Sequence, residues 1–380
     1  MMAPHSGLER RVLAALESTP ARIAVVIGGC GTGRTTLLHG LADRLGRDQC
    51  QYVDIERSAS TPERFHRALA GATPFTLNGR GPATQEPATS VRGAFERTLA
   101  LLARGRASGD RPATFLLDEV LELRTFESFP GLRHVLRETL QALADSGNRF
   151  VLTSRYVTRA HRLLRDGSAR FEVIHLPPLT STDVTAMLPP MGDTPVGHRE
   201  FLGRAIHALS DGRTAYVHAL GEAISTMSGR GGDPISALTA LLTGEGALAS
   251  WCGYRYELRL HKARGYGALK AILEILSEAE PLTLTEVAQR LHRTPGSTKD
   301  YLSWLEDVDL IVARQKRYSF VDPMLRLWVR LHCRPVPPSV DEVAREVQTY
   351  AVSRLPHAEP NLAMAAASGD RKEWGIIEID

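Results

Sequence analysis

The segment Arg22–Leu38, with the sequence RIAVVIGGCGTGRTTLL, decides how the chain folds. Its apolar run Ile23–Ile27 is typical of a buried strand, the glycine-rich stretch after it indicates a tight turn, and the remainder favours a helix. Within the turn, four residues separate Gly28 from Gly33, and a cation and two hydroxyl residues follow. This is the spacing of a phosphate-binding P-loop.

Each residue type in this turn suits a bound phosphate. Glycines allow backbone N–H groups to curl around the anion without a Cβ clash, and the N-terminal end of the following helix adds positive potential. The hydroxyl of Thr35 is expected where Mg²⁺ binds. An ordinary strand–turn–helix junction is the alternative, but it does not require this combination of spacing and hydroxyl. The residues predicted to contact a nucleotide here are Gly28, Gly29, Cys30, Gly31, Thr32, Gly33, Arg34, Thr35 and Thr36.

Arg34 stands where P-loops usually have lysine. A guanidinium keeps the positive charge and can bind phosphate through two N–H groups, but it is planar and bulkier than an ammonium group. Positioning supplies most of the catalysis of phosphoryl transfer. The substitution therefore puts ATP hydrolysis in more doubt than nucleotide binding.

The composition is that of a soluble globular protein. The 380 residues are 43% hydrophobic and 23% charged, which allows two or three domains. No apolar run approaches the ~20 residues needed to cross a bilayer, and the N-terminus lacks an apolar signal core. The four cysteines are scattered and show no CxxC spacing, which is typical of reduced thiols. These features predict a cytoplasmic protein with no membrane partner, and the net charge of +3 is too small to imply nucleic acid by itself.

Strand and helix patterns alternate through the first half of the chain. Strands are predicted at 23–27, 51–55, 113–118, 149–154 and 171–176. Helices are predicted at 7–18, 35–45, 61–70, 91–104, 132–146 and 157–166. Residues 71–90, rich in Gly, Pro, Thr and Ala, predict a surface loop. The alternation indicates an α/β fold with a parallel sheet covered by helices on both faces.

Polar residues lie at the carboxyl ends of two of the predicted strands. Asp118-Glu119, after an apolar strand, matches the second P-loop NTPase signature, in which Asp118 holds Mg²⁺ and Glu119 activates the attacking water. A carboxylate pair that caps a helix is the alternative. Thr153 and Ser154 are candidates to hydrogen-bond the γ-phosphate or the water, and they equally suit an ordinary strand end. Right-handed crossovers bring the carboxyl ends of parallel strands to one edge, so we expect these groups to meet the P-loop.

After Pro177, the chain has helical patterns and no strand pattern up to residue 243. The helices are predicted at 181–188, 198–210, 213–227 and 234–243, and together they predict a helical lid. Arg213, at the start of the third of these helices, is a candidate to reach the phosphates from the lid. The chain is rich in arginine, so many other arginines are alternative candidates for this contact.

Three helices and a hairpin are predicted next, which is the pattern of a winged helix-turn-helix. The helices cover 269–277, 283–291 and 294–307, and the strands cover 310–312 and 318–321. The third helix and the wing supply the DNA-binding candidates Ser297, Thr298, Lys299, Tyr301, Arg314, Lys316 and Arg317. Nearby acidic residues weaken the positive field, and winged helices also bind proteins, so both partners stay open. Helices at 323–332 and 340–353 precede a polar, Ala-rich tail.

The motifs GGCGTGRTT, FLLDE, VLTSR, SDGRTA and YSFVDPMLRLW together resemble those of the archaeal-type ATPases of the P-loop AAA+/STAND group, relatives of origin-recognition ATPases. The resemblance covers roughly residues 8–335. It implies binding of ATP and Mg²⁺, nucleotide-driven conformational switching, and engagement of double-stranded DNA or a partner protein. It also places Arg213 at the lid's sensor-arginine position and Thr153-Ser154 at the strand-end sensor.

The predicted division of the chain is a P-loop NTPase core (1–179), a helical lid (180–250), a winged helix domain (265–335), and a C-terminal helix and tail (336–380). The leading hypothesis is an ATP-binding switch with weak or conditional ATPase activity, with assembly into a homo-oligomer left open. The alternatives are an interaction protein that binds nucleotide without hydrolysing it, and a small-molecule kinase. The kinase is disfavoured because the last third predicts a winged helix rather than an acceptor-binding lid.

Overall fold

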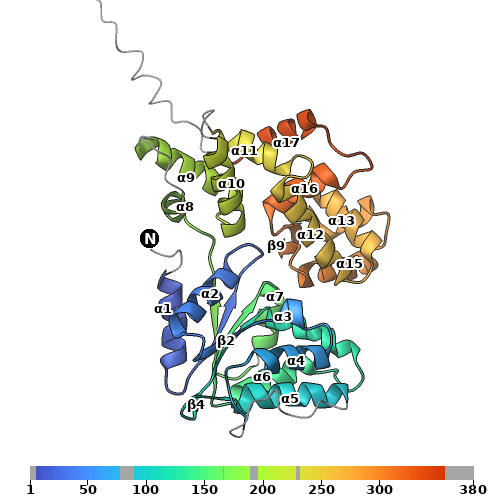
Figure 1. The fold of residues 1–380 in the computed structure, drawn as a ribbon. Coiled ribbons are helices and arrows are strands. Elements are labelled where there is room, and N and C mark those ends of the chain that lie inside the picture. Colours follow the sequence, from blue (N-terminus) through green and yellow to red (C-terminus); the bar gives the residue numbers. More distant parts are fainter. Residues whose placement is uncertain (1–5, 78–89, 166, 189–195, 228–231, 356–380) are drawn as a thin grey trace, which may run out of the picture.

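The structure is a computed structural model that describes residues 6–77, 90–165, 167–188, 196–227 and 232–355. It has three regions: a sheet with its covering helices, a group of helices above the sheet, and a C-terminal helical region beside that group (Figure 1). Within the described ranges, no helix combines the length and apolar character needed to cross a membrane.

A five-stranded parallel sheet forms the base of the molecule. Its strands run in the spatial order β2-β5-β6-β1-β7. They are β1 (Ile23–Ile27), β2 (Cys50–Asp54), β5 (Thr114–Asp118), β6 (Arg149–Ser154) and β7 (Phe171–His175). All four strand pairings are parallel. The parallel sheet expected from the alternating pattern is therefore confirmed.

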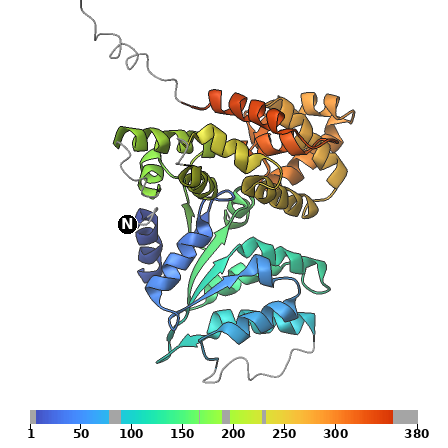
Figure 2. The same ribbon diagram turned by 45° about the horizontal axis from the view of Figure 1, so that its top comes forward.

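Helices cover both faces of this sheet (Figures 1 and 2). In β1, Ala24 and Val26 face the apolar cluster beneath α1 (Ser6–Glu17) and α2 (Arg34–Leu45). Ile23, Val25 and Ile27 face the larger cluster on the other side. That side is covered by α4 (Pro62–Ala72), α5 (Val91–Arg104), α6 (Val135–Asp145) and α7 (Val157–Leu164). Burial on both faces explains why β1 is apolar throughout.

Short elements that the sequence patterns did not predict complete this region. They are α3 (Ile55–Ser58), the 3₁₀ helix η2 (Val120–Ser128), and the small hairpin of β3 (Arg106–Ala107) and β4 (Arg111–Pro112). Most of the expected surface loop at 71–90 cannot be assessed, because residues 78–89 lie outside the described residues.

Five helices follow the sheet: α8 (Ser181–Met187), α9 (Val196–Ser210), α10 (Thr214–Met227), α11 (Pro234–Leu242) and α12 (Ala247–His261). The first four agree with the predicted lid helices to within two residues. The fifth, α12, was not predicted, because exposed Tyr254 and buried Arg259 interrupt its apolar pattern. It packs against both α11 and the C-terminal region.

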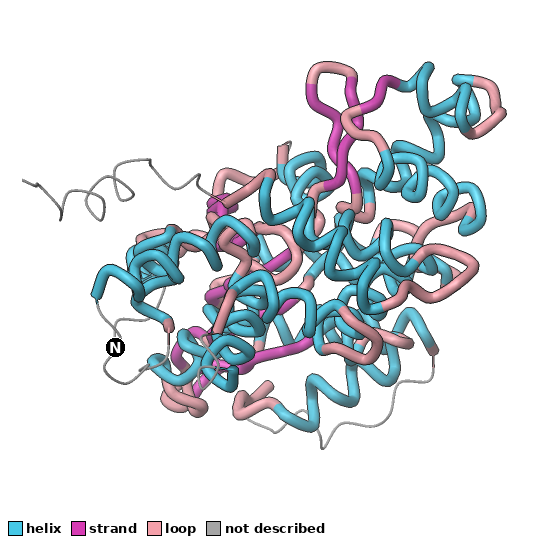
Figure 3. The backbone as a smooth tube through the Cα atoms, turned by 90° about the horizontal axis from the view of Figure 1, so that it is seen from above, coloured by secondary structure: helices cyan, strands magenta, loops and turns pink. Residues whose placement is uncertain are grey.

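The C-terminal region combines helices with a small antiparallel sheet of order β8-β10-β9. Its elements are α13 (Tyr266–Glu278), β8 (Leu282–Thr283), α14 (Leu284–Arg290), α15 (Pro295–Asp307), β9 (Ile311–Arg314), β10 (Arg317–Phe320), α16 (Pro323–His332) and α17 (Val340–Val352). The turn between β9 and β10 has left-handed φ values of 50° at Gln315 and 62° at Lys316, as tight two-residue hairpins require. This hairpin projects beyond its neighbouring helices in Figure 3.

Candidate functional site

The P-loop connects β1 to α2 and depends on its glycines. Gly31 and Gly33 have φ values of 78° and 96°, a left-handed conformation that favours glycine. A Cβ at Gly28 would lie 2.9 Å from the Thr32 hydroxyl and 3.2 Å from the Leu176 carbonyl oxygen. The loop therefore has the compact backbone that a phosphate cradle needs.

Arg34 folds back across this loop. Its side chain is buried, and one guanidinium nitrogen donates to the carbonyl oxygens of Gly28 and Gly29. The other terminal nitrogen donates to Glu119 Oε1 at 2.7 Å. The positive charge of Arg34 thus lies inside the loop, paired with a carboxylate.

Three hydroxyl groups surround the carboxylate of Asp118. Thr35 and Tyr52 donate to Oδ2 at 2.7 and 3.0 Å, and Thr153 donates to Oδ1. A hydroxyl oxygen beside a carboxylate at a P-loop suits Mg²⁺, which prefers oxygen ligands. The Thr35–Asp118 pair therefore fits the cation that the fold class implies. Tyr52 was missed because its contact is spatial, across the pairing of β2 with β5.

Glu119 is buried and held at both carboxylate oxygens. Oε1 accepts from Arg34, and Oε2 accepts from the backbone N–H of Arg155 at 3.0 Å. Burial alone would raise the pKa of Glu119, but the two arginines outweigh it and lower that pKa to about 2. Its backbone has a left-handed φ of 57°, an uncommon conformation for a residue with a side chain. Glu119 is therefore ionised and fully engaged.

The two predicted sensor residues on β6 differ in placement. Thr153 lies inside the site, where its hydroxyl donates to Asp118 and accepts from the Glu119 N–H at 2.9 Å. The Ser154 hydroxyl instead accepts from the backbone N–H of Tyr156 at 3.0 Å. Thr153 thus links the Asp118 carboxylate to the backbone of Glu119, whereas Ser154 shapes the turn after the strand.

Arg213, the candidate arginine of the predicted lid, contacts the P-loop. It directly precedes α10, is 6% exposed, and donates to the Cys30 carbonyl oxygen at 2.9 Å. It also donates to the Val321 carbonyl oxygen at 2.7 Å and lies 3.6 Å from an Asp322 carboxylate oxygen. Arg213 therefore joins the loop to the segment between β10 and α16.

The first residues of α10 also bind the loop. The Thr214 hydroxyl donates to the Thr32 carbonyl oxygen at 3.1 Å, and the Ala215 N–H donates to that of Gly31 at 3.0 Å. The start of α10 therefore covers the loop directly.

The unpredicted helix α12 covers the loop as well. A Cβ at Gly31 would lie 3.4 Å from the Trp251 ring. Buried Arg259 donates to the Asp309 carbonyl oxygen at 3.0 Å. Burial raises the pKa of the Cys30 thiol, but Arg259 and neighbouring arginines outweigh that effect and lower it. The loop is therefore enclosed by cationic groups.

Buried N–H groups around the loop remain without acceptors. Among the described residues, the Nε atoms of Arg34, Arg213 and Arg259 have no hydrogen-bond partner. Buried donors are rarely left unpaired in native proteins. Their position around a glycine-rich loop fits an anion such as a triphosphate.

The DNA-binding candidates lie in the C-terminal region with unequal exposure. Lys299, Arg314 and Lys316 are exposed. Arg317 is also exposed, and it donates to the Pro281 carbonyl oxygen at 3.1 Å. Thr298 is fully buried, and its hydroxyl donates to the Thr294 carbonyl oxygen at 3.0 Å, so its side chain is not on the surface.

Two further candidates on α15 are half-buried. The Ser297 hydroxyl donates to the carbonyl oxygen of Thr294 at 3.1 Å. The Arg293 guanidinium lies over the Tyr301 ring, with its Cζ 5.6 Å from the ring centroid. These local contacts leave the four exposed cations as the better-placed candidates.

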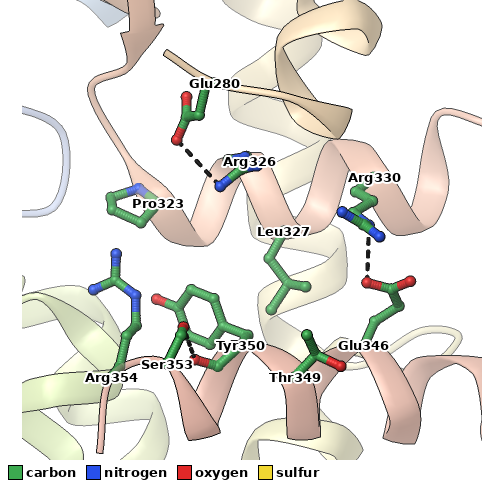
Figure 4. Close-up of a pocket in the computed structure, with 10 residues that line it drawn as sticks. All are labelled: Glu280, Pro323, Arg326, Leu327, Arg330, Glu346, Thr349, Tyr350, Ser353 and Arg354. Atoms are coloured by element: carbon green, nitrogen blue, oxygen red, sulfur yellow. Dashed lines mark hydrogen bonds and ion pairs between the residues drawn. The ribbon is translucent and has the colours of Figure 1, made fainter.

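A separate cavity of about 290 Å³ lies between α16 and α17, away from the P-loop (Figure 4). Among its lining residues, Arg326 pairs with Glu280 at 3.3 Å, and Arg330 of α16 pairs with Glu346 of α17 at 2.9 Å. Its arginines are thus matched by carboxylates, and it contains none of the predicted site residues.

The sheet order, the glycine-rich loop and the acidic pair define the fold of a P-loop NTPase. No family model matches the chain, and no curated protein matches it. Among solved structures, the chain is similar to the Walker-type ATPase of Pyrococcus abyssi, with a TM-score of 0.64 and 18% identity over 87% of this chain and 96% of that one. It also matches Cdc6p of Pyrobaculum aerophilum, with a TM-score of 0.41 and 12% identity over 93% and 96% of the two chains. RuvB of Thermotoga maritima gives 0.43 and 12% over 83% and 92%.

Proposed function

We propose that the protein is an ATP-binding switch of the AAA+/STAND type with weak or conditional ATP hydrolysis. The observation that carries this proposal is the meeting of Arg34, Asp118 and Glu119 at one sheet edge, within hydrogen-bonding reach of the P-loop. Each of these groups has a separate task in the reaction.

The loop backbone and Arg34 bind and orient the phosphates, and Thr35 and Asp118 hold the cation. When bound, Mg²⁺ neutralises charge on the phosphate oxygens. Arg34 must exchange Glu119 for phosphate oxygens, and this exchange frees one oxygen of Glu119 to orient water. In the described arrangement Glu119 is a weak base, because its pKa is lowered to about 2 by Arg34 and Arg155 against the effect of burial. This supports hydrolysis that depends on a rearrangement.

The switch role rests on the groups that cover the loop. Arg213 donates to the loop and to Val321 of the C-terminal region at once. A nucleotide that draws Arg213 to its phosphates would weaken that connection. We propose that α13 to β10 act as a winged helix that passes this change to DNA or to a partner protein.

Nucleotide binding is the first test. Isothermal titration with ATP, ADP and GTP, with and without Mg²⁺, should show ATP binding that Mg²⁺ strengthens. Weak GTP binding is expected, because no NKxD-type base-reading motif is evident. No binding of any nucleotide would refute the proposal.

Hydrolysis is tested by steady-state phosphate release from the wild type, Glu119→Gln and Arg34→Lys. The wild type should exceed Glu119→Gln, and Arg34→Lys should differ in rate because a lysine cannot hold Glu119 and the loop carbonyls together. If all three bind ATP and none exceeds background, the protein is a non-hydrolysing interaction protein. Turnover only with an added metabolite would indicate the kinase.

DNA binding is tested by fluorescence anisotropy with duplex DNA at low salt, where phosphate contacts are strongest. A Lys299→Ala, Lys316→Ala double variant should weaken binding, whereas Lys270→Ala, outside the candidate surface, should not. A flat titration for the wild type would leave a protein as the partner of this region.

A further inference from the structure

A chain of ion pairs connects α12 to Glu119. The Arg155 guanidinium is 2% exposed, and its Nε lies 3.4 Å from Glu119 Oε2. Its Nη2 contacts Glu56 and lies 3.1 Å from Glu122 Oε1. Lys262, at the end of α12, places Nζ 3.0 Å from Glu56 and 2.8 Å from Glu122. These ion pairs are not visible in the sequence, because Glu56, Arg155 and Lys262 are about 100 residues or more apart from one another.

The charges along this chain alternate and balance. The cations are Arg34, Arg155 and Lys262, and the carboxylates are Glu56, Glu119 and Glu122. Arg155 and Lys262 share the same two carboxylates. If Lys262 leaves, Arg155 is the one cation among the described residues that still pairs with Glu56 and Glu122, and the Tyr156 hydroxyl still donates to Glu122 at 2.8 Å. A buried carboxylate that has lost a cation is destabilised, so Glu122, whose side chain is 8% exposed, would draw the Arg155 guanidinium away from Glu119.

Lys262 is the most exposed of the three cations and the one that can leave. Its side chain is 29% exposed, whereas those of Arg155 and Glu119 are 3% and 9% exposed. Beside it lies a cavity of about 540 Å³ that includes Glu56, Glu122 and Tyr254 in its lining. Because α12 packs on α13 and α16, a shift of the C-terminal region would carry Lys262 with it (Figures 1 and 2).

We propose that Lys262 is a positioning residue that acts on Glu119 through Arg155, an inference that rests on the hydrolytic role proposed for Glu119. With α12 in place, Lys262 neutralises Glu56 and Glu122, and Arg155 holds Glu119. When α12 moves away, the Arg155 guanidinium turns to Glu56 and Glu122, and Glu119 Oε2 loses this cation while it keeps the hydrogen bond from the backbone N–H of Arg155. The position of α12 is thereby transmitted to the carboxylate without any direct contact.

A double-mutant cycle tests this link without requiring hydrolysis. Urea midpoints are measured for the wild type, Lys262→Met, Glu119→Gln and the double variant. Methionine keeps most of the aliphatic stem and removes the charge. The shift in the double variant should differ from the sum of the single shifts, although Lys262 and Glu119 do not touch. The matched cycle with Arg264→Met should be additive, because Arg264 is an exposed cation that does not belong to this set of ion pairs.

Phosphate release gives the second readout. Lys262→Met should raise kcat about fivefold, within the range of coupled charge networks, with KM for ATP unchanged. Lys262→Arg keeps the charge and should have the wild-type kcat. A merely structural role for α12 would not predict a raised kcat in Lys262→Met together with a wild-type kcat in Lys262→Arg. An additive cycle would overturn the proposal, as would a kcat for Lys262→Met equal to or below that of the wild type. A non-additive cycle with no phosphate release in any variant would uphold the link and refute hydrolysis alone.

Discussion

Asp309 allows a direct test of the electrostatics around the P-loop. It lies in the turn between α15 and β9, is 6% exposed, and has a left-handed φ of 56°. Its Oδ2 has no hydrogen-bond partner among the described residues. Burial raises the pKa of Asp309 to about 6, although Arg259, Arg213 and Arg34 act in the opposite direction. The carboxylate is therefore destabilised where it stands.

The size of the effect follows from that pKa. A rise from the ordinary 3.8 to about 6 corresponds to about 3 kcal/mol against the ionised form. Between these two pH values the unfolded chain has lost the proton and the folded chain keeps it, so stability falls as pH rises. Above pH 6 the full cost is present. Asp309→Asn removes the charge and tolerates the left-handed backbone, so it should stabilise the fold by up to about 3 kcal/mol at pH 7.5.

Urea unfolding at pH 4, 5, 6 and 7.5 measures this difference. The gain from Asp309→Asn should be small at pH 4 and should grow through pH 6. Asp300→Asn, an exposed carboxylate on α15, is the matched control and should show no such growth. A difference between Asp309→Asn and the wild type that stays constant with pH, or a less stable variant at pH 7.5, would refute the reasoning.

Two further predictions concern the loop itself. Thr35→Val keeps the side-chain shape but removes the hydroxyl beside Asp118. In a titration, the strengthening of ATP binding by Mg²⁺ should therefore fall about tenfold or more, while binding without Mg²⁺ changes little. Equal Mg²⁺ dependence in the variant and the wild type would contradict the assignment of Thr35. Gly33→Ala forces a Cβ into a left-handed backbone, 3.2 Å from the Thr214 hydroxyl, so it should cost about 1–2 kcal/mol of unfolding free energy, and a urea midpoint like that of the wild type would disprove this strain.

The sheet was predictable because its signals are local. β1 and β5 are short apolar runs followed directly by the P-loop and by Glu119, and β6 and α5 have the bounds that the sequence suggested. Helix α12 was missed for a physical reason. Its Arg259 is buried by contacts with residues distant in sequence, so a polar position that reads as exposed lies in the interior.

The site was partly predictable. Asp118, Glu119 and Thr153 lie at the carboxyl ends of strands, and the parallel topology alone brings them to the P-loop. The partners that hold them were not predictable. Arg155 is 2% exposed and pairs with Glu119, Glu56 and Glu122. Such a placement depends on contacts between elements that are distant in the sequence, and no spacing along the sequence encodes it.

The position of α12 also limits how the chain can be divided or recombined. The helix follows α11 directly, but its residues lie against the P-loop at Trp251, the turn before β9 at Arg259, and α16 through Tyr256 and Trp328, whose rings are 5.3 Å apart. A fragment that ends before Ala247 would expose the apolar side of α11 and uncover the loop. A chimaera with a foreign C-terminal region would have to keep α12 and match α16 to it. Because α12 packs on both α11 and α16, replacing the part of the chain on one side of the helix requires that its contacts on the other side be kept.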